Sequence, residues 1–187
     1  MSQVLRQRVR SRARDAAAGG GLLLAALLLA GCSAALDWRQ IQPDGWSLVA
    51  ALPCKPATQQ RQVALAGQKV VMTMLACSAD AHTFALASAE LGDPAQVQPV
   101  LLALGQAARM NLQGRVQAEQ PANVPGMTPS PAALRWRLLG QLPSGQAAAE
   151  QVQVFAHGTR VFQAAVIGAQ ADDARTQPFF DALKVLP

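Results

Sequence analysis

The chain has 187 residues and a formal net charge of +5, from 16 basic and 11 acidic side chains. Five of the arginines and one aspartate lie within residues 1–31, so the rest of the chain carries 11 basic and 10 acidic side chains. Proteins that bind nucleic acid carry a large basic surplus, which this balance does not provide. We therefore predict no nucleic-acid partner, and the remaining length fits a single domain of ordinary size.

The first 31 residues have the pattern of an export signal. Five arginines precede an apolar run at residues 21–30, which leads into the sequence Leu29-Ala30-Gly31-Cys32. The run is shorter than the ~20 apolar residues that cross a bilayer, but it fits the core of a secretory signal. The segment resembles the signal peptide of bacterial lipoproteins, whose lipobox has a leucine, two small residues and an obligatory cysteine.

This resemblance implies cleavage before Cys32, a diacylglyceryl thioether on its sulfur and an acyl group such as palmitate on its amine. In a Gram-negative host it also implies the periplasmic face of the outer membrane, because Ser33 stands where an aspartate retains lipoproteins in the inner membrane. An ordinary secretory signal with an incidental cysteine is the alternative. The predicted organisation is a signal peptide at 1–31, a lipidated tether at 32–43 that reaches about 40 Å at most, and one domain at 44–187.

The cysteines give a second prediction. Lipid attachment at Cys32 leaves two thiols, those of Cys54 and Cys77. An even pair of thiols in an oxidising compartment predicts a disulfide. A bridge across a loop of this length stabilises a fold by about 3 kcal/mol in the chain-entropy model. A pair of buried free thiols is the alternative.

The first half of the domain is predicted to contain four strands, at residues 46–52, 62–66, 69–77 and 82–90. The third of these is apolar at both even and odd positions, which is typical of a strand covered on both faces and predicts a central place in the sheet. A helix is then predicted to begin at Asp93 and Pro94, a favoured N-cap and a favoured first helical residue. Pro99 follows, so the helix either kinks or begins at that residue, and we expect a kink.

The second half contains three predicted strands, at residues 134–138, 151–156 and 160–167. Residues 120–131 carry four prolines and predict an irregular crossing before these strands. In the first of the three, Arg135 and Arg137 alternate with apolar residues, as in a half-buried strand. Asp172 and Asp173 are expected to cap a final helix. The order of elements predicts an α+β domain with a mainly antiparallel sheet of six to seven strands and two packed helices.

Three short motifs resemble those of a large group of uncharacterised bacterial envelope proteins. They are Leu52-Pro53-Cys54-Lys55-Pro56, Arg160-Val161-Phe162-Gln163-Ala164 and Phe179-Phe180-Asp181-Ala182-Leu183. These proteins are similar in layout to the PsbP-like and DcrB-like domains, in which a short sheet lies between helices. The resemblance covers residues 46–185 and implies a PsbP-like fold but no particular reaction. In such a meander the first and third strands run the same way, which would place Cys54 and Cys77 at one edge of the sheet.

Few residues are candidates for catalysis or metal binding. Asp80 and His82 offer two metal ligands, but a transition-metal site needs three or four. His157 falls in a predicted hairpin turn, where an exposed histidine is expected. The sequence lacks the motifs of serine hydrolases, phosphate loops and dinucleotide-binding folds. We therefore predict no metal, no cofactor and no enzymatic activity.

Two pairs of side chains are candidates for contact with a partner. Arg135 and Arg137 form a basic pair that either meets a lipid phosphate or an acidic partner, or is a solvated strand face. Trp38 and Trp46 flank the tether, and they either rest on the lipid interface or pack in the core, which we expect for Trp46.

The sequence thus predicts a lipid-anchored protein of the cell envelope that serves as a non-enzymatic binding or assembly module. Its partner is expected to be the membrane, together with another envelope protein or an amphiphile. Two alternatives remain. One is a carrier that holds a hydrophobic ligand between helix and sheet, and the other is an envelope enzyme that uses His82, Asp80 or His157.

Overall fold

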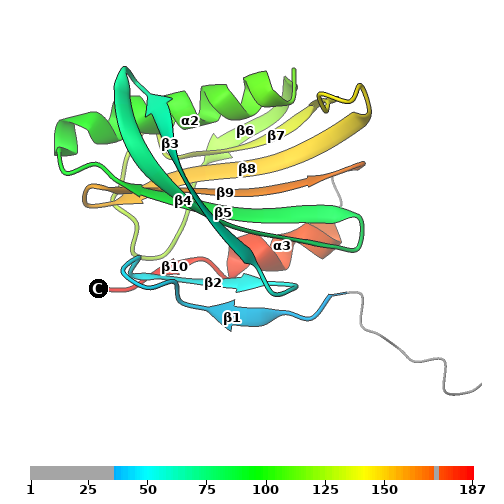
Figure 1. Ribbon diagram of the computed structural model, residues 1–187, viewed down its shortest axis with the longest axis horizontal. Coiled ribbons are helices and arrows are strands. Elements are labelled where there is room, and N and C mark those ends of the chain that lie inside the picture. The colour runs from blue at the N-terminus through cyan, green and yellow to red at the C-terminus, as the bar shows by residue number, and fades with distance from the viewer. Residues whose placement is uncertain (1–35, 171–172) are drawn as a thin grey trace, which may run out of the picture. The chain divides into compact units, whose positions relative to one another are not determined.

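A computed structural model of the protein describes residues 36–170 and 173–187, which form an α+β fold as predicted (Figure 1). Seven strands form one antiparallel sheet in the order β3-β4-β5-β9-β8-β7-β6. In that order their bounds are β3 Ala57–Leu65, β4 Gln68–Ala79, β5 His82–Glu90, β9 Arg160–Gly168, β8 Ala147–His157, β7 Leu134–Gln141 and β6 Arg115–Pro121. The predicted signal segment, the lipid site Cys32 and Asp172 lie outside the described residues.

A second sheet has three strands, β1 (Arg39–Ile41), β2 (Leu48–Leu52) and β10 (Lys184–Val185), in the order β1-β2-β10. Strand β1 lies within the range predicted as a tether, and the Asp37 N–H donates to the Pro53 carbonyl at 2.9 Å. The folded domain therefore extends further toward the N-terminus than the predicted boundary at residue 44. Strand β2, which we predicted as the first strand of the main sheet, belongs to the small sheet instead.

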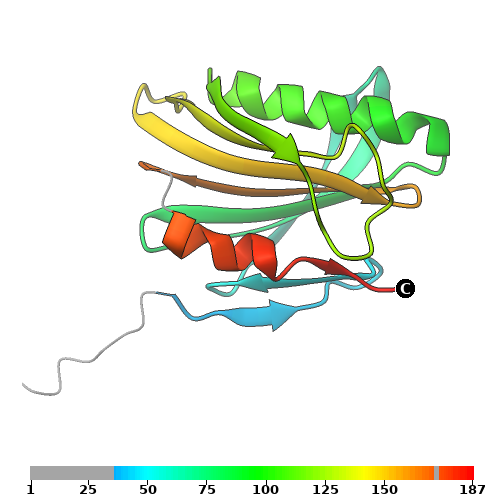
Figure 2. The same ribbon diagram turned by 180° about the vertical axis from the view of Figure 1, so that it is seen from behind.

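The two faces of the main sheet are covered differently (Figures 1 and 2). Helix α2 (Val97–Asn111) crosses one face, whereas helix α3 (Asp173–Asp181) and the small sheet lie on the other. Under α2 the core is aliphatic, apart from one indole, and includes Val100, Leu101, Leu104, Trp136, Leu138, Val152 and Val154. Under α3 it is aromatic and includes Trp46, Phe84, Phe155, Phe162, Phe179 and Phe180. Among the described residues, no helix is long and apolar enough to span a bilayer.

Helix α2 forms without the expected kink. The Asp93 side chain accepts the N–H of Ala95 at 2.9 Å and caps a short 3₁₀ turn, η2 (Pro94–Gln96). The α-helix then begins at Val97, so Pro99 is its third residue. At that position a backbone N–H has no partner within the helix, and a proline can occupy it without the loss of a hydrogen bond.

Two strands of the main sheet differ from the prediction. Strand β4 is not central but second from the edge, because β3 pairs along its outer side over nine residues. Its Val71 is 56% exposed, so the strand is not covered on both faces. Strand β6 was not predicted, because every residue in it is exposed and it lacks the apolar alternation by which a strand is recognised.

Cys54 and Cys77 form a disulfide, as predicted, with their Cα atoms 6.0 Å apart. Cys54 follows β2 in the small sheet, whereas Cys77 lies in β4 of the main sheet. The bridge therefore joins the two sheets, and the expected arrangement of both cysteines on strands of one meander is wrong.

Both tryptophans near the N-terminus pack on the aromatic core beneath α3. Trp46 is 6% exposed, and its ring centroid lies 6.2 Å from that of Phe162. Trp38 meets the ring of Phe84 edge to face at 5.7 Å. Trp46 therefore packs in the core, as predicted, and Trp38 also packs against this core.

Candidate functional site

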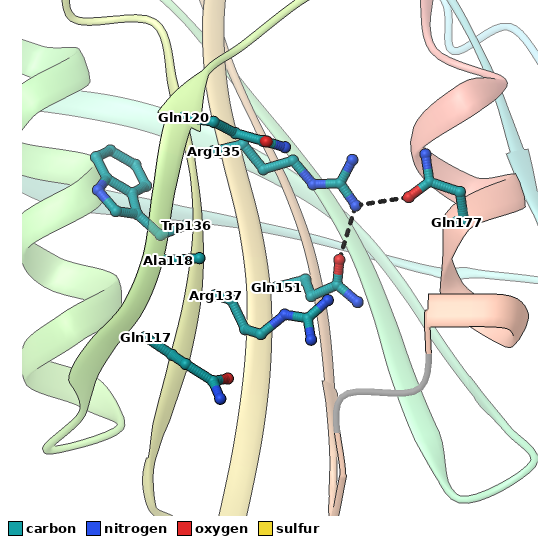
Figure 3. Close-up of a pocket in the computed structure, with 8 residues that line it drawn as sticks. All are labelled: Gln117, Ala118, Gln120, Arg135, Trp136, Arg137, Gln151 and Gln177. Atoms are coloured by element: carbon teal, nitrogen blue, oxygen red, sulfur yellow. Dashed lines mark hydrogen bonds between the residues drawn. The ribbon is translucent and has the colours of Figure 1, made fainter.

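A depression lined mainly by polar side chains lies on the α3 face of the main sheet. There α3 leaves β6, β7 and the adjoining part of β8 incompletely covered, and a groove of about 390 Å³ opens between these strands and the helix (Figure 3). Its lining combines two arginines with four glutamines: Gln117, Ala118, Gln120, Arg135, Trp136, Arg137, Gln151 and Gln177.

The alternation of β7 places both arginines in this groove. Trp136 and Leu138 are buried beneath α2, so Arg135 and Arg137 point to the opposite face. Strand β6 forms the far wall, with Gln120 opposite Arg135 and Ala118 opposite Arg137. The register of β6 shifts between Val116 and Ala118, and this bulge brings two successive residues, Gln117 and Ala118, to the groove.

Arg135 is held in a defined orientation. Its Nη2 donates to Gln151 Oε1 at 2.7 Å and to Gln177 Oε1 at 3.1 Å. Its guanidinium carbon lies 4.0 Å from the centroid of the Phe180 ring, a cation–π contact. Strand β8 thus supplies one partner, and α3 supplies the other two.

Both glutamine amides are themselves oriented by further hydrogen bonds. Gln151 Nε2 donates to Thr176 Oγ1 at 2.8 Å, and Gln177 Nε2 donates to Asp181 Oδ1 at 2.6 Å. Gln151 is only 4% exposed, so its amide is part of the interior. The network fixes the plane of the guanidinium before any ligand arrives, which lowers the entropic cost of binding one.

The groove offers positive charge and amide groups. No acidic side chain occurs among the described residues that line it. Guanidinium groups bind oxyanions through paired N–H donors, and amides both donate and accept hydrogen bonds. The lining is therefore suited to binding a polar group through hydrogen bonds.

The structure does not assemble the other candidate residues into a site. His82 Nδ1 donates to the Asp80 carbonyl at 2.8 Å, while the Asp80 carboxylate pairs with Arg175. The Nε2 atom of His82 is buried and makes no hydrogen bond with residues 36–170 or 173–187. In the part of the chain that the structure describes, no three histidine, cysteine, aspartate or glutamate side chains cluster as metal ligands would.

His157 lies far from this pair. It stands opposite Arg160 at one end of β9, whereas His82 stands opposite Gly168 at the other end. Its Nδ1 is 3.0 Å from the Gly126 carbonyl. His157 therefore contacts the irregular segment 120–131 rather than projecting freely from a turn. An enzyme that uses both histidines together has no support from this geometry.

The space between α2 and the sheet is filled by protein. A Cβ added to Gly105 would lie 2.4 Å from the Trp136 ring, so the helix backbone rests directly on the indole. Trp136 is fixed in turn, because its Nε1 donates to Glu119 Oε2 at 2.6 Å. Beside the helix an open groove of about 640 Å³ remains, where Leu102 and Met110 are 52% and 68% exposed.

The chain matches no protein-family model, and no curated protein resembles its sequence significantly.

Sequence reasoning identified the two arginines but missed the rest of the groove. Arg135 and Arg137 were found through the period of β7, which separates them from the core side chains. Gln117 and Gln120 lie on a strand without apolar alternation, and Gln177 approaches only because α3 packs on this face. Gln151 carried no separate signal, because Glu150 and Gln153 are polar residues buried in the same strand.

Proposed function

We propose that the protein is a lipid-anchored binding protein of the cell envelope, held to the bilayer through Cys32, and that the groove on the α3 face is its binding surface. The lipobox-like sequence Leu29-Ala30-Gly31-Cys32 supports the anchor. The Cys54–Cys77 bridge supports an oxidising compartment, because disulfides persist outside the cytosol.

The fixed Arg135 guanidinium carries the binding part of this proposal. Two amide oxygens and an aromatic face hold it at the wall of a groove that also contains Arg137. Guanidinium and amide groups bind through hydrogen bonds, whereas nucleophilic and acid–base catalysis need groups that attack a substrate or exchange protons. The lining therefore favours recognition over reaction.

The anchor would hold the domain close to the membrane. The described fold begins at Leu36, which is four residues beyond Cys32. Four extended residues reach about 14 Å at most. The start of the described fold would then lie close to the bilayer surface.

Mass analysis of the full-length protein extracted from membranes tests the anchor. We expect a polypeptide that begins at Cys32 and carries a diacylglyceryl group and one further acyl chain. The Cys32→Ala variant should lack all three chains, whereas Cys54→Ser/Cys77→Ser is the matched control and should keep them. An unmodified wild-type protein that retains its leader would contradict the proposal.

A further inference from the structure

We propose that the open groove beside α2 binds an extended segment of a partner protein, which adds to the main sheet as a further strand along β6. This groove lies on the other face of the sheet from the groove next to α3, and its role does not depend on the function proposed there. The partner segment would be apolar at every second residue and acidic toward its C-terminal end.

Helix α2 and strand β6 form the two walls of this groove, which has a volume of about 640 Å³. The chain leaves α2 at Asn111 and enters β6 at Arg115, so a short connection brings the two walls together. Glu119 lies on the β6 wall, and the buried Trp136 of β7 lines the floor between the walls. The hydrogen bond from Trp136 to Glu119 joins the floor to the strand, so this part of the groove is already formed.

Exposed apolar side chains surround the groove. Leu102 and Met110 on α2 line it and are 52% and 68% exposed. Val116 stands opposite Leu138 in the sheet, so it points to the same face, and it is 37% exposed. Of the four large apolar side chains that are exposed in residues 36–170 and 173–187, three therefore gather here. Such a concentration of exposed apolar side chains is typical of an interaction surface.

The open edge of β6 selects an extended segment as the occupant. Strand β6 is an outermost strand of the main sheet (Figures 1 and 2), and all seven of its residues are exposed. In the part of the chain that the structure describes, only β7 pairs with it, and no backbone hydrogen bond of a turn or loop involves residues 115–121. Its outer N–H and C=O groups can therefore pair with another chain. A lipid surface or a helix offers no row of main-chain partners to such an edge.

Irregularities in β6 set the length of the added strand. The register shifts between Val116 and Ala118, and Pro121 at the end of the strand has no N–H to donate. The added strand would therefore be short, about four residues. The same features make β6 a poor template for aggregation, which long and regular edges promote.

The two faces of the sheet at β6 specify the side chains of the partner. An added strand directs successive side chains to opposite faces of a sheet. Those on the α2 face would contact Leu102 and Met110. Those on the α3 face would lie beside Gln117 and Gln120, which are exposed amides. The segment should therefore be apolar at the first set of positions and polar at the second.

A basic end of the groove favours an acidic residue in the partner. Arg109 in the last turn of α2 and Arg115 at the start of β6 are both exposed. Within residues 36–170 and 173–187 neither forms an ion pair. Pairing is antiparallel throughout the main sheet, and antiparallel addition would place the C-terminal end of the segment beside Arg115. A carboxylate near that end would be attracted by both arginines.

The test selects binders from a phage library of random short peptides with the full-length protein in phosphatidylcholine nanodiscs. We expect the enriched peptides to be apolar at every second position and acidic toward the C-terminal end. N-methylation of one alternate set of residues should abolish binding, and N-methylation of the other set should not, because an added strand turns every second N–H toward its neighbour. No enrichment, apolar residues at helical spacing, or equal effects of the two methylated sets would overturn the proposal.

Two variants locate the binding of a selected peptide. Leu102→Gln should weaken it about tenfold, and the matched control is Val71→Gln, which changes a side chain that is 56% exposed on β4. Arg109→Gln should weaken it about threefold, but only while the peptide keeps its acidic residue, and Arg61→Gln on β3 is the control for charge. Equal weakening by a variant and its control would refute the site. Unchanged far-ultraviolet circular dichroism checks that each variant is folded.

Hydrogen exchange and light scattering distinguish the peptide from other occupants of the groove. With the selected peptide bound, exchange should slow in β6 but not in β3, the other edge of the main sheet. A dimer of the protein alone in maltoside micelles, which Leu102→Gln converts to a monomer, would assign the groove to a second copy. Slower exchange in β6 of the protein alone in nanodiscs than in micelles would assign it to lipid. Either of these results would overturn the proposal.

Discussion

The two faces of the seven-stranded sheet accommodate ionisable side chains in opposite ways. On the α3 face, Arg135 keeps its charge and is surrounded by an aromatic ring and two amide oxygens. On the α2 face, Glu150 precedes Val152 on the same side of β8, is 5% exposed, and makes no hydrogen bond or ion pair with the described residues. Burial raises the pKa of Glu150 to about 7. Partners therefore stabilise the charged form of Arg135, whereas burial without partners favours the neutral form of Glu150.

The elements that cover the two faces of the main sheet are also attached to it differently. Helix α2 is one continuous element whose buried stripe, from Val100 to Ala108, lies across β8 and β9. The cover of the α3 face is composite, because α3, β2 and β10 come from distant parts of the sequence. Besides the backbone, the disulfide between Cys54 and Cys77 links this cover covalently to the main sheet.

Removal of the disulfide should have the largest effect. The bridge closes a loop of 23 residues, so the variant Cys54→Ser/Cys77→Ser should lose about 3.5 kcal/mol of unfolding free energy, chiefly because its unfolded chain is less constrained. Urea unfolding measures the loss. Hydrogen exchange should show greater loss of protection in β2 than in α2. Only β2 belongs to the layer that the disulfide cross-links to the main sheet.

Reduction of the wild-type bridge is the control for that experiment. The reduced wild-type protein and the double-serine variant should unfold at the same urea concentration. Equal loss of protection in α2 and β2 would show that the layers on the two faces of the sheet do not open independently. That result would contradict the proposed difference between the two faces.

Titration of Glu150 should have the next largest effect. Below about pH 4.5 the side chain is neutral in both the folded and the unfolded chain, so it does not affect stability. As the pH rises toward 7, the unfolded chain loses this proton while the folded chain retains it, and the folded state becomes less stable by about 3 kcal/mol. Above pH 7 the loss is complete. Glu150→Gln should therefore gain stability relative to the wild type between pH 4.5 and pH 7.5.

Urea unfolding of both proteins at several pH values measures this difference. Asp44→Asn removes a carboxylate from an exposed position and controls for the change in net charge. If the unfolding free energies of the wild type and Glu150→Gln differ by the same amount at every pH, the assignment of Glu150 as a buried acid without partners is wrong.

The fold was largely predictable because most of its strands carry a local signal. The alternation of Trp136 and Leu138 with Arg135 and Arg137 defines both faces of β7 without any tertiary information. The disulfide followed from counting the cysteines, although the predicted geometry behind it was wrong. Strands β1 and β10 have only three and two residues, too short for a period to be recognised, and they form because β2 pairs with both.

The groove was only half predictable, because two of its walls depend on contacts between distant residues. The pairing of β6 with β7 places Gln120 opposite Arg135, and nothing within residues 115–121 indicates a strand. Gln151 and Gln153 alternate with apolar residues along β8, yet both are only 4% exposed, because the α3 side also covers this strand. The hydrogen bond from Gln151 to Thr176 shows how that cover removes an amide from water without leaving it unpaired.

The contact between Arg135 and Phe180 should give the smallest effect, and it measures how the α3 face keeps its charge. A double-mutant cycle of Arg135→Met and Phe180→Leu should show a coupling energy of about 1 kcal/mol, the usual size of a partly buried cation–π contact. The matched cycle of Arg137→Met and Phe180→Leu should show almost none, because the Phe180 ring has its cation contact with Arg135. Urea unfolding of the single and double variants supplies both values. Equal coupling in the two cycles would mean that the ring senses the total charge of the groove rather than one oriented guanidinium. The proposed binding groove would then lose its preorganised part, since the orientation of Arg135 is what distinguishes such a groove from a merely basic strand.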